Sequence, residues 1–184
     1  MKMMKWLFPL FVVVALVQLV VPAGMIVRRE LTLKEGKIFK FHAQPVDPYD
    51  AFRGRYVTLS LEPNSVTVPT NSSLEYQWRE VYITLDEGPD GFARFTGVFL
   101  EPQTGKDYIK TKSAGLNEGK LSLRLPFDRF YMEESTAPKA ERAYLEHSKR
   151  GQQDAFVTIR VSDGFAVLEN FYVAGKPITE FVKE

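Results

Sequence analysis

The chain has 184 residues, with 24 basic and 23 acidic side chains, two histidines and no cysteine. The length fits one domain plus an anchor, and the missing cysteines exclude disulfides, thiolate catalysis and zinc–sulfur sites. Two of the basic residues precede residue 28, which leaves 22 basic against 23 acidic side chains and a formal charge of −1 for residues 28–184. A domain without a basic field is not expected to bind nucleic acid.

The first predicted element is a membrane-spanning helix. Residues 6–27, WLFPLFVVVALVQLVVPAGMIV, contain no charged side chain, and about 20 apolar residues in a helix cross the hydrocarbon core of a bilayer. We therefore expect residues 1–27 to form an N-terminal anchor that contacts the membrane through residues 6–27. Gln18 is its only strongly polar side chain and could form a hydrogen bond with a partner helix.

A cleaved signal peptide is the alternative interpretation of this segment. Lys2 and Lys5 would be its charged start and the valine-rich run its apolar core. The run is long for such a core, however, and Arg28 and Arg29 follow it like a stop-transfer flank. An uncleaved anchor is therefore favoured, with a short cytoplasmic N-terminus and residues 28–184 exported as a β-rich extracytoplasmic domain.

Alternation of apolar and polar residues predicts strands along most of this domain. Turn-forming residues at 87–91 and 162–164 separate pairs of these runs, which indicates two hairpins. The predicted strands cover residues 37–43, 56–61, 78–85, 92–100, 108–111, 120–125, 127–132, 155–161 and 165–169, and residues 171–173 and 178–182 flank a final turn.

One predicted helix interrupts the strands. Ser135 and Thr136 offer capping hydroxyls, Pro138 suits an early position, and Gly151 can end the helix. Its expected buried face carries Ala140, Ala143, Tyr144 and His147. The fold class is therefore mainly β: a transmembrane helix followed by an antiparallel β sandwich or open barrel with one inserted helix.

The stretch PVDPYDAFRGRYVTL gathers acidic and basic residues around a proline and a glycine. Asp47 can cap a helical turn that begins at Pro48, and Gly54 can end that turn. Arg53 could pair with Asp47 or with Asp50, which is the other nearby acid. We favour a folded corner for this stretch, while catalysis by the two carboxylates is the alternative.

The same stretch resembles the bacterial membrane-anchored proteins named for a GDYxxLxY motif. At two motif positions the chain departs from that pattern, because Arg55 replaces the aspartate and Leu61 replaces the second tyrosine. The segments RFYMEES at 129–135 and DGFAVLENFYVAGKPI at 163–178 are similar to later parts of the family. The matching residues are Arg28, Arg29, Glu30, Asp47, Pro48, Asp50, Arg53, Gly54, Tyr56 and Leu59, together with Arg129 and Tyr131 in the later segment.

The resemblance implies an exported, anchored β domain of unknown function. Such proteins are often encoded beside multi-pass membrane proteins, which implies a role as a partner of such a protein. The resemblance also implies a single-pass protein of the bacterial inner membrane whose C-terminal domain is periplasmic or extracellular. We expect a non-enzymatic binding or accessory partner of another membrane protein, without a cofactor. The candidate binding or structural residues are Asp47, Pro48, Asp50, Arg53, Gly54, Tyr56, Leu59, Arg129 and Tyr131, and no catalytic residue is assigned.

Enzymatic alternatives find limited support in the residues. A signal-peptidase-like mechanism needs a serine near the membrane with a lysine base, but no serine precedes Ser60 and Thr32 is the only hydroxyl of that kind between the span and the motif. A β-barrel hydrolase could divide acid and base roles between Asp47 and Asp50, or between Glu133 and Glu134. This hydrolase is the second function that we consider.

Histidines and aromatic residues are interpreted structurally. His42 and His147 lack the spacing of metal ligands, so each is expected to be half-buried. Aromatic side chains crowd the first predicted hairpin, where core packing and cross-strand pairs are favoured over a ligand groove or docking face. These aromatic residues are Tyr76, Trp78, Tyr82, Phe92, Phe95 and Phe99.

Overall fold

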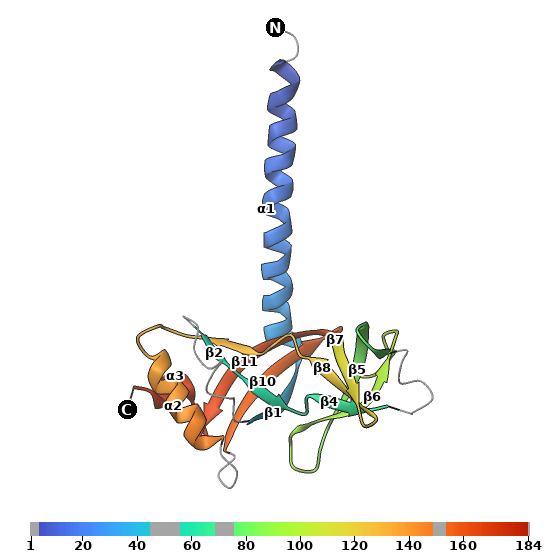
Figure 1. Cartoon of the computed structure of the whole chain (residues 1–184). Coiled ribbons are helices and arrows are strands. Elements are labelled where there is room, and N and C mark those ends of the chain that lie inside the picture. Colours follow the sequence, from blue (N-terminus) through green and yellow to red (C-terminus); the bar gives the residue numbers. More distant parts are fainter. Residues whose placement is uncertain (1–3, 45–55, 69–75, 149–153, 184) are drawn as a thin grey trace.

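The computed structural model describes residues 4–44, 56–68, 76–148 and 154–183, and it shows a long helix standing on a β-rich body (Figure 1). Helix α1 covers Met4–Glu35, so it contains the predicted apolar segment and continues beyond Val27. Residues 28–35 include no glycine or proline, and the N–H of Gly36 still donates to the carbonyl of Thr32 over 2.9 Å. The helix therefore reaches the body without a flexible joint.

The first of two five-stranded sheets lies under the foot of α1. Its strands run antiparallel in the order β12-β11-β10-β1-β3, and α1 contacts β10 and β11. The strands are β1 (Lys37–Gln44), β3 (Ser60–Glu62), β10 (Ala155–Ser162), β11 (Phe165–Val173) and β12 (Lys176–Pro177).

The second sheet has the order β4-β8-β7-β5-β6 and is also antiparallel. A separate two-stranded ribbon joins β2 (Tyr56–Thr58) to β9 (Arg129–Tyr131). Antiparallel strands make up most of the described body, so the mainly β prediction is confirmed. The strands of the second sheet are β4 (Ser65–Thr67), β5 (Glu80–Glu87), β6 (Ala93–Phe99), β7 (Tyr108–Asn117) and β8 (Lys120–Arg124).

The single strand predicted over residues 56–61 is wrong, because the structure divides it at Leu59. The N–H of Leu59 donates to the carbonyl of Asp128 over 2.8 Å, and its side chain is buried. Before this residue β2 pairs with β9, and after it β3 pairs with β1. The chain therefore passes from the ribbon to the first sheet within one residue.

Other differences concern the ends of elements. Strand β5 begins at Glu80 rather than Trp78, which has a φ of 55° and belongs to the preceding turn. Strand β7 continues past Thr111, and residues 165–173 form one strand instead of two. The hairpins predicted at residues 87–91 and 162–164 are confirmed.

The C-terminal segment predicted as extended contains a short helix, α3 (Ile178–Phe181). Ile178 and Val182 are both buried, while Glu180 between them is exposed. A strand would bury all three alternate side chains on one face, whereas a helical turn places residues four apart together without the middle one. Burying the two apolar residues while leaving Glu180 in solvent thus favours the helix.

Helix α2 (Ala137–His147) is the inserted helix, and its predicted apolar face is confirmed. Ala140, Ala143 and Tyr144 are buried. The expected capping of the helix N-terminus by a side-chain hydroxyl is not confirmed at Thr136. Its hydroxyl donates to the carbonyl of Glu133 and makes no cap hydrogen bond. The predicted end at Gly151 is wrong, because α2 ends at His147 and Ser148 is its C-cap, whose N–H donates to the carbonyl of Tyr144.

Two clusters of buried side chains form the core. The larger joins β1, β10, β11 and α2 and includes Phe41, Tyr144 and Phe171. The smaller lies within the second sheet, and Phe95 and Leu125 pack against both clusters. The two sheets therefore share one continuous apolar interior.

Candidate functional site

The ribbon of β2 and β9 brings together residues that the sequence singled out separately. Tyr56 is paired with Tyr131, and Thr58 is paired with Arg129. Leu59 follows in the core. The remaining candidates, Asp47, Pro48, Asp50, Arg53 and Gly54, lie outside the described residues, and so does Arg55. Leu61, which replaces the second motif tyrosine, is buried opposite Ala43 on β1.

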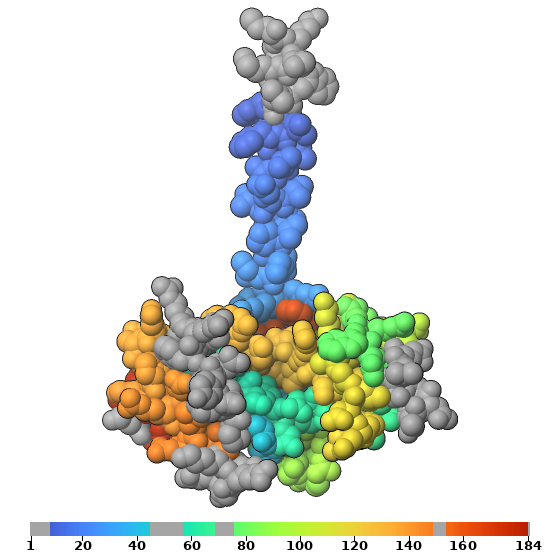
Figure 2. All heavy atoms as spheres, in the orientation of Figure 1, coloured from blue at the N-terminus to red at the C-terminus, as the bar shows by residue number. Residues whose placement is uncertain are grey.

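A groove of about 600 Å³ lies beside this ribbon, at the foot of α1. Figure 2 shows the surface hollowed below the helix, where orange-red atoms of the C-terminal hairpin are visible. We call this hollow the basic groove. Its lining consists of Arg28, Arg29, Lys110, Pro126, Phe127, Arg129, Phe130, Tyr131, Gly164, Phe165, Ala166, Val167, Leu168 and Glu169.

Two arginines of α1 form the upper wall of the basic groove. The guanidinium carbon of Arg28 lies 4.6 Å from the centroid of the Phe165 ring, an arrangement in which the ring face attracts the cation. Arg29 is exposed. Within the described ranges, no acidic side chain lies at ion-pair distance from either arginine.

Two further basic residues come from the body. The Nζ of Lys110 lies 2.9 Å from the Glu80 carboxylate, and this hydrogen bond raises the pKa of Lys110, so the amine stays charged at neutral pH. The Nε of Arg129 lies 3.8 Å from Asp128. The groove thus presents four cationic side chains drawn from three separate segments.

Among the described residues, Glu169 is the single acidic side chain of the lining, and Arg160 engages it. The Nε of Arg160 donates to Glu169 over 2.9 Å, and each side chain is less than a quarter exposed. The Nη1 of Arg160 also donates to the carbonyl of Gly36 over 3.1 Å. Arg160 therefore neutralises the carboxylate and fixes the end of α1.

The floor of the groove depends on the tight turn at Gly164. Its φ of +75° is typical of glycine, and its carbonyl accepts from the N–H of Lys110 over 2.9 Å. A Cβ at this position would lie 2.6 Å from the ring of Tyr108. The turn predicted to close one hairpin therefore also joins the two sheets.

Tyr144 fixes the edge of the first sheet next to the motif stretch. Its hydroxyl donates to the carbonyl of Gln44 and accepts from the N–H of Ser60 over 3.1 Å. Burial raises the pKa of Tyr144 to about 12, because the phenolate would lose its hydration. The residue therefore acts as a structural hydrogen-bonding group at neutral pH.

The alternative chemical candidates do not assemble into a site among the described residues. Thr32 is buried, and its hydroxyl donates to the carbonyl of Arg28 within the helix over 2.9 Å. His42 stacks on Phe92 with ring centroids 3.5 Å apart. The Nδ1 of His147 lies 2.8 Å from the Oδ1 of Asp154. Both histidines are half-buried as expected.

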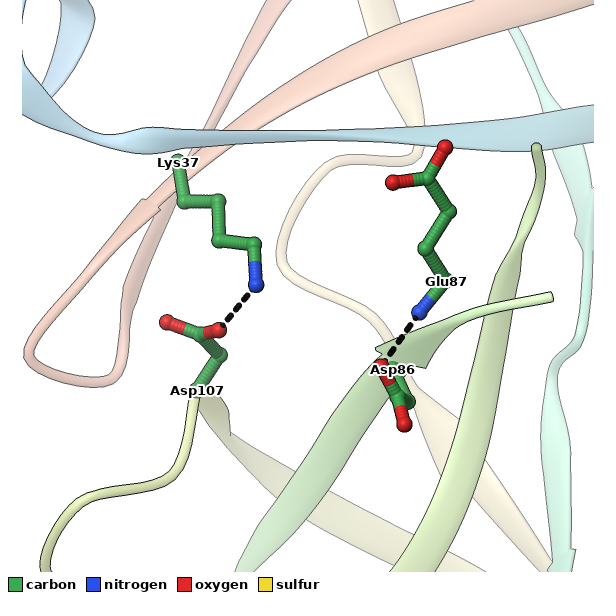
Figure 3. A network of polar contacts seen from close by, with 4 residues as sticks. All are labelled: Lys37, Asp86, Glu87 and Asp107. Atoms are coloured by element: carbon green, nitrogen blue, oxygen red, sulfur yellow. Dashed lines mark hydrogen bonds and ion pairs between the residues drawn. The ribbon is translucent and has the colours of Figure 1, made fainter.

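An acidic cluster at the junction of the sheets is occupied by a lysine (Figure 3). The Nζ of Lys37 on β1 lies 2.6 Å from Asp107, whose hydrogen bond raises the pKa of Lys37, and Asp86 and Glu87 add to this effect. No group of three metal-ligating side chains occurs in the part of the chain that the structure describes. The cluster therefore links the sheets.

The aromatic residues of the first hairpin follow the packing interpretation only in part. Phe95 packs against both core clusters, and Tyr82 meets Tyr108 edge-on at 5.7 Å. Trp78, in contrast, is 69% exposed. The turn that carries it, residues 76–79, lies at the end of the body nearest α1 (Figure 1).

Most residues of the basic groove could not be predicted from the sequence. Arg28 and Arg29 stood out as a flank of the apolar run and as matches to the family, and Phe165 only as part of the segment 163–178, while nothing local distinguished Lys110. The Asp163-Gly164 turn predicted a hairpin but not its contact with β7, and Arg129 and Tyr131 were candidates without a predicted groove. These residues converge only through the pairing of the sheets.

Comparison with known proteins gives one match. A family model described as GDYXXLXY protein matches residues 18–171, and this range contains every residue that lines the basic groove. No curated protein and no solved structure matches the chain.

Proposed function

The chain belongs to the GDYXXLXY family, and we propose that it is a single-span protein of the bacterial inner membrane that binds a multi-pass membrane protein as a non-enzymatic partner. In this proposal α1 is an uncleaved anchor, and the β-rich body lies on the periplasmic or extracellular side. The proposal rests on the composition of α1 and on one polar position within it.

The length and hydropathy of α1 support the anchor. It is long and apolar enough to cross a membrane, with a mean hydropathy of 2.7 over its most apolar window and no residue of that window buried against the body. The 20 residues from Phe8 to Val27 contain no charge. At about 1.5 Å per residue they extend about 30 Å, which is the thickness of the hydrocarbon core.

Gln18 carries the partner proposal. Its side chain is exposed on α1 near the middle of the apolar run, where lipid tails offer no hydrogen-bonding group. Four residues later Pro22 lies inside the helix and has no N–H to donate to the Gln18 carbonyl. One residue therefore brings both an amide and a backbone carbonyl that lacks its usual helical donor.

The face around Gln18 is suited to close approach by another helix. Ala15 and Pro22 lie three residues before and four residues after Gln18, so all three share one side of α1. Ala15 is a small residue of the kind that lets helix backbones approach, and the polar side chain of Gln18 beside it can bond across the interface. A transmembrane helix of a partner would supply the missing donor.

Affinity purification of the full chain from its native membrane in a mild detergent tests this proposal. We expect one multi-pass protein to be recovered in near-stoichiometric amount. The Gln18→Leu variant should weaken its recovery about 5- to 30-fold, since an interhelical hydrogen bond contributes about 1–2 kcal/mol. Gln18→Asn keeps the amide and is the matched control. A chain that purifies alone, or equal recovery with Gln18→Leu, would overturn the partner role.

A further inference from the structure

We propose that the basic groove binds the phosphate headgroup of an anionic phospholipid. The lipid belongs to the leaflet on the same side of the membrane as the β-rich body. This inference rests on the proposed membrane anchor, but it does not depend on the protein partner. It assigns a ligand class to the hollow that α1, β9 and the β10–β11 hairpin form together.

The position of the groove follows from the end of the apolar run. Arg28 and Arg29 come directly after Val27, and a span of about 30 Å places the next residues in the headgroup layer. The same two arginines line the groove. The mouth of the groove therefore lies at the level of the lipid phosphates.

The joint between α1 and the body holds the groove at that level. The helix continues without a break to Glu35, and Thr32 is buried against the body. The side chain of Arg160 bonds to Gly36 at the end of the helix. Because these contacts fix the body to the anchor, the groove cannot swing away from the bilayer surface.

The charge of the groove complements a phosphodiester. Arg28 and Arg29 have no ion-pair partner within the described ranges, whereas Lys110 and Arg129 lie beside Glu80 and Asp128. Glu169, the one carboxylate among the described lining residues, is already engaged by Arg160. Arginine presents paired N–H donors that match phosphate oxygens. The volume of about 600 Å³ lies within the range of about 300–1,000 Å³ that is usual for small-molecule sites.

The remaining lining suits the part of a lipid next to its phosphate. Phe130 and Leu168 are half-buried, so they offer apolar surface to the start of the acyl chains. Tyr131 is 67% exposed beside the groove, and Trp78 is also exposed. The turn of residues 76–79 that carries Trp78 lies at the end of the body nearest α1 (Figure 1). Exposed Trp and Tyr side chains are typical of the membrane interface.

Native mass spectrometry of the full chain in a neutral detergent tests the proposal. The probes are phosphatidylglycerol, phosphatidylcholine and glycerol 3-phosphate. We expect one phosphatidylglycerol to bind at least about tenfold more tightly than phosphatidylcholine. Arg29→Gln should weaken that binding about fivefold, since each basic residue near an anionic surface has an effect of this order.

Lys34→Gln is the matched control for the substitution. Lys34 is an exposed basic residue of the same helix that does not line the groove, and its change alters the net charge equally. Equal lipid binding by the two variants would overturn the proposal, as would equal binding of the two lipids. Displacement of phosphatidylglycerol by an equal concentration of glycerol 3-phosphate would overturn it in favour of a soluble anion.

The intact mass of the same sample distinguishes a failure of the anchor from a failure of the lipid site. A membrane-extracted chain that lacks residues 1–27 would overturn the anchor and the lipid site together. A chain that retains them but binds lipid without dependence on Arg29 would overturn the lipid site alone.

Discussion

The guanidinium of Arg28 lies over the ring of Phe165, 4.6 Å from its centroid. The first residue belongs to the long helix and the second begins the last long strand, so this contact fixes the foot of α1 to the C-terminal hairpin. Arg160 provides a second attachment through Gly36. The direction in which α1 leaves the body is therefore determined by side chains that also build the basic groove.

The Arg28–Phe165 contact should be measurable as a coupling energy. We expect a double-mutant cycle of Arg28→Gln and Phe165→Leu to give about 0.5–1 kcal/mol, as for cation–π pairs at exposed sites. Urea unfolding of the full chain in a neutral detergent measures the four stabilities. The same cycle with Lys34→Gln in place of Arg28→Gln is the control and should give no coupling. A coupling near zero for Arg28 would show that the contact adds no stability.

Tyr144→Phe should destabilise the body by about 1–3 kcal/mol. The change removes the hydroxyl that bonds to Gln44 and Ser60, and buried backbone groups left without partners cost about this much. Tyr172→Phe is the control, because Tyr172 is half-buried and stacks on Phe156 with no hydroxyl hydrogen bond among the described residues. Equal stability of the two variants in urea unfolding would contradict a structural role for the Tyr144 hydroxyl.

Alkaline pH should weaken the body through Tyr144. Its pKa is raised from 10.0 to about 12 in the folded chain, so between these values the unfolded chain loses a proton that the folded chain keeps. The stabilisation is complete below pH 10 and declines as pH rises towards 12, by about 1.4 kcal/mol per pH unit. The stability difference between the wild type and Tyr144→Phe should narrow accordingly across unfolding curves from pH 9 to 11.5. A constant difference would contradict this prediction.

Gly164→Ala should lower the stability of the chain more than Gly119→Ala, although both glycines have a left-handed backbone conformation. Gly164 and Gly119 have φ values of +75° and +76°, so alanine at either position pays about 1–2 kcal/mol for its backbone conformation. Only at Gly164 would the new Cβ also meet the Tyr108 ring, at 2.6 Å; at Gly119 nothing lies within 4 Å. Thermal unfolding of both variants should show the larger loss for Gly164→Ala. Equal losses would mean that Tyr108 moves aside without cost.

Local signals in the sequence predicted several elements correctly. The uncharged run before Arg28 predicted a long apolar helix, and Asp163-Gly164 predicted the hairpin of β10 and β11. The spacing of Ala140, Ala143 and Tyr144 predicted the buried face of α2. In each case the information lies within a few neighbouring residues, where backbone preference and periodicity act directly.

Contacts between distant segments explain the errors. Nothing local marks Leu59 as the point where the chain changes sheets, because its position is set by the carbonyl of Asp128. Likewise, the helical turn at Ile178 depends on which of its neighbours the core can accept. The candidate site also depends on a contact between distant segments. The sequence associated Tyr56 with nearby motif residues, whereas the structure pairs it with Tyr131 on β9.

By itself, the sequence determined the apolar helix, the predominance of antiparallel strands and the family, because each is encoded in a contiguous pattern. Only the tertiary structure decided that Arg28 and Arg29 share a groove with Lys110, Arg129 and the hairpin at Gly164. The physical reason is that charges far apart along the chain become neighbours only after the two sheets pack. The backbone bond from Lys110 to Gly164 is the contact through which that packing forms the groove.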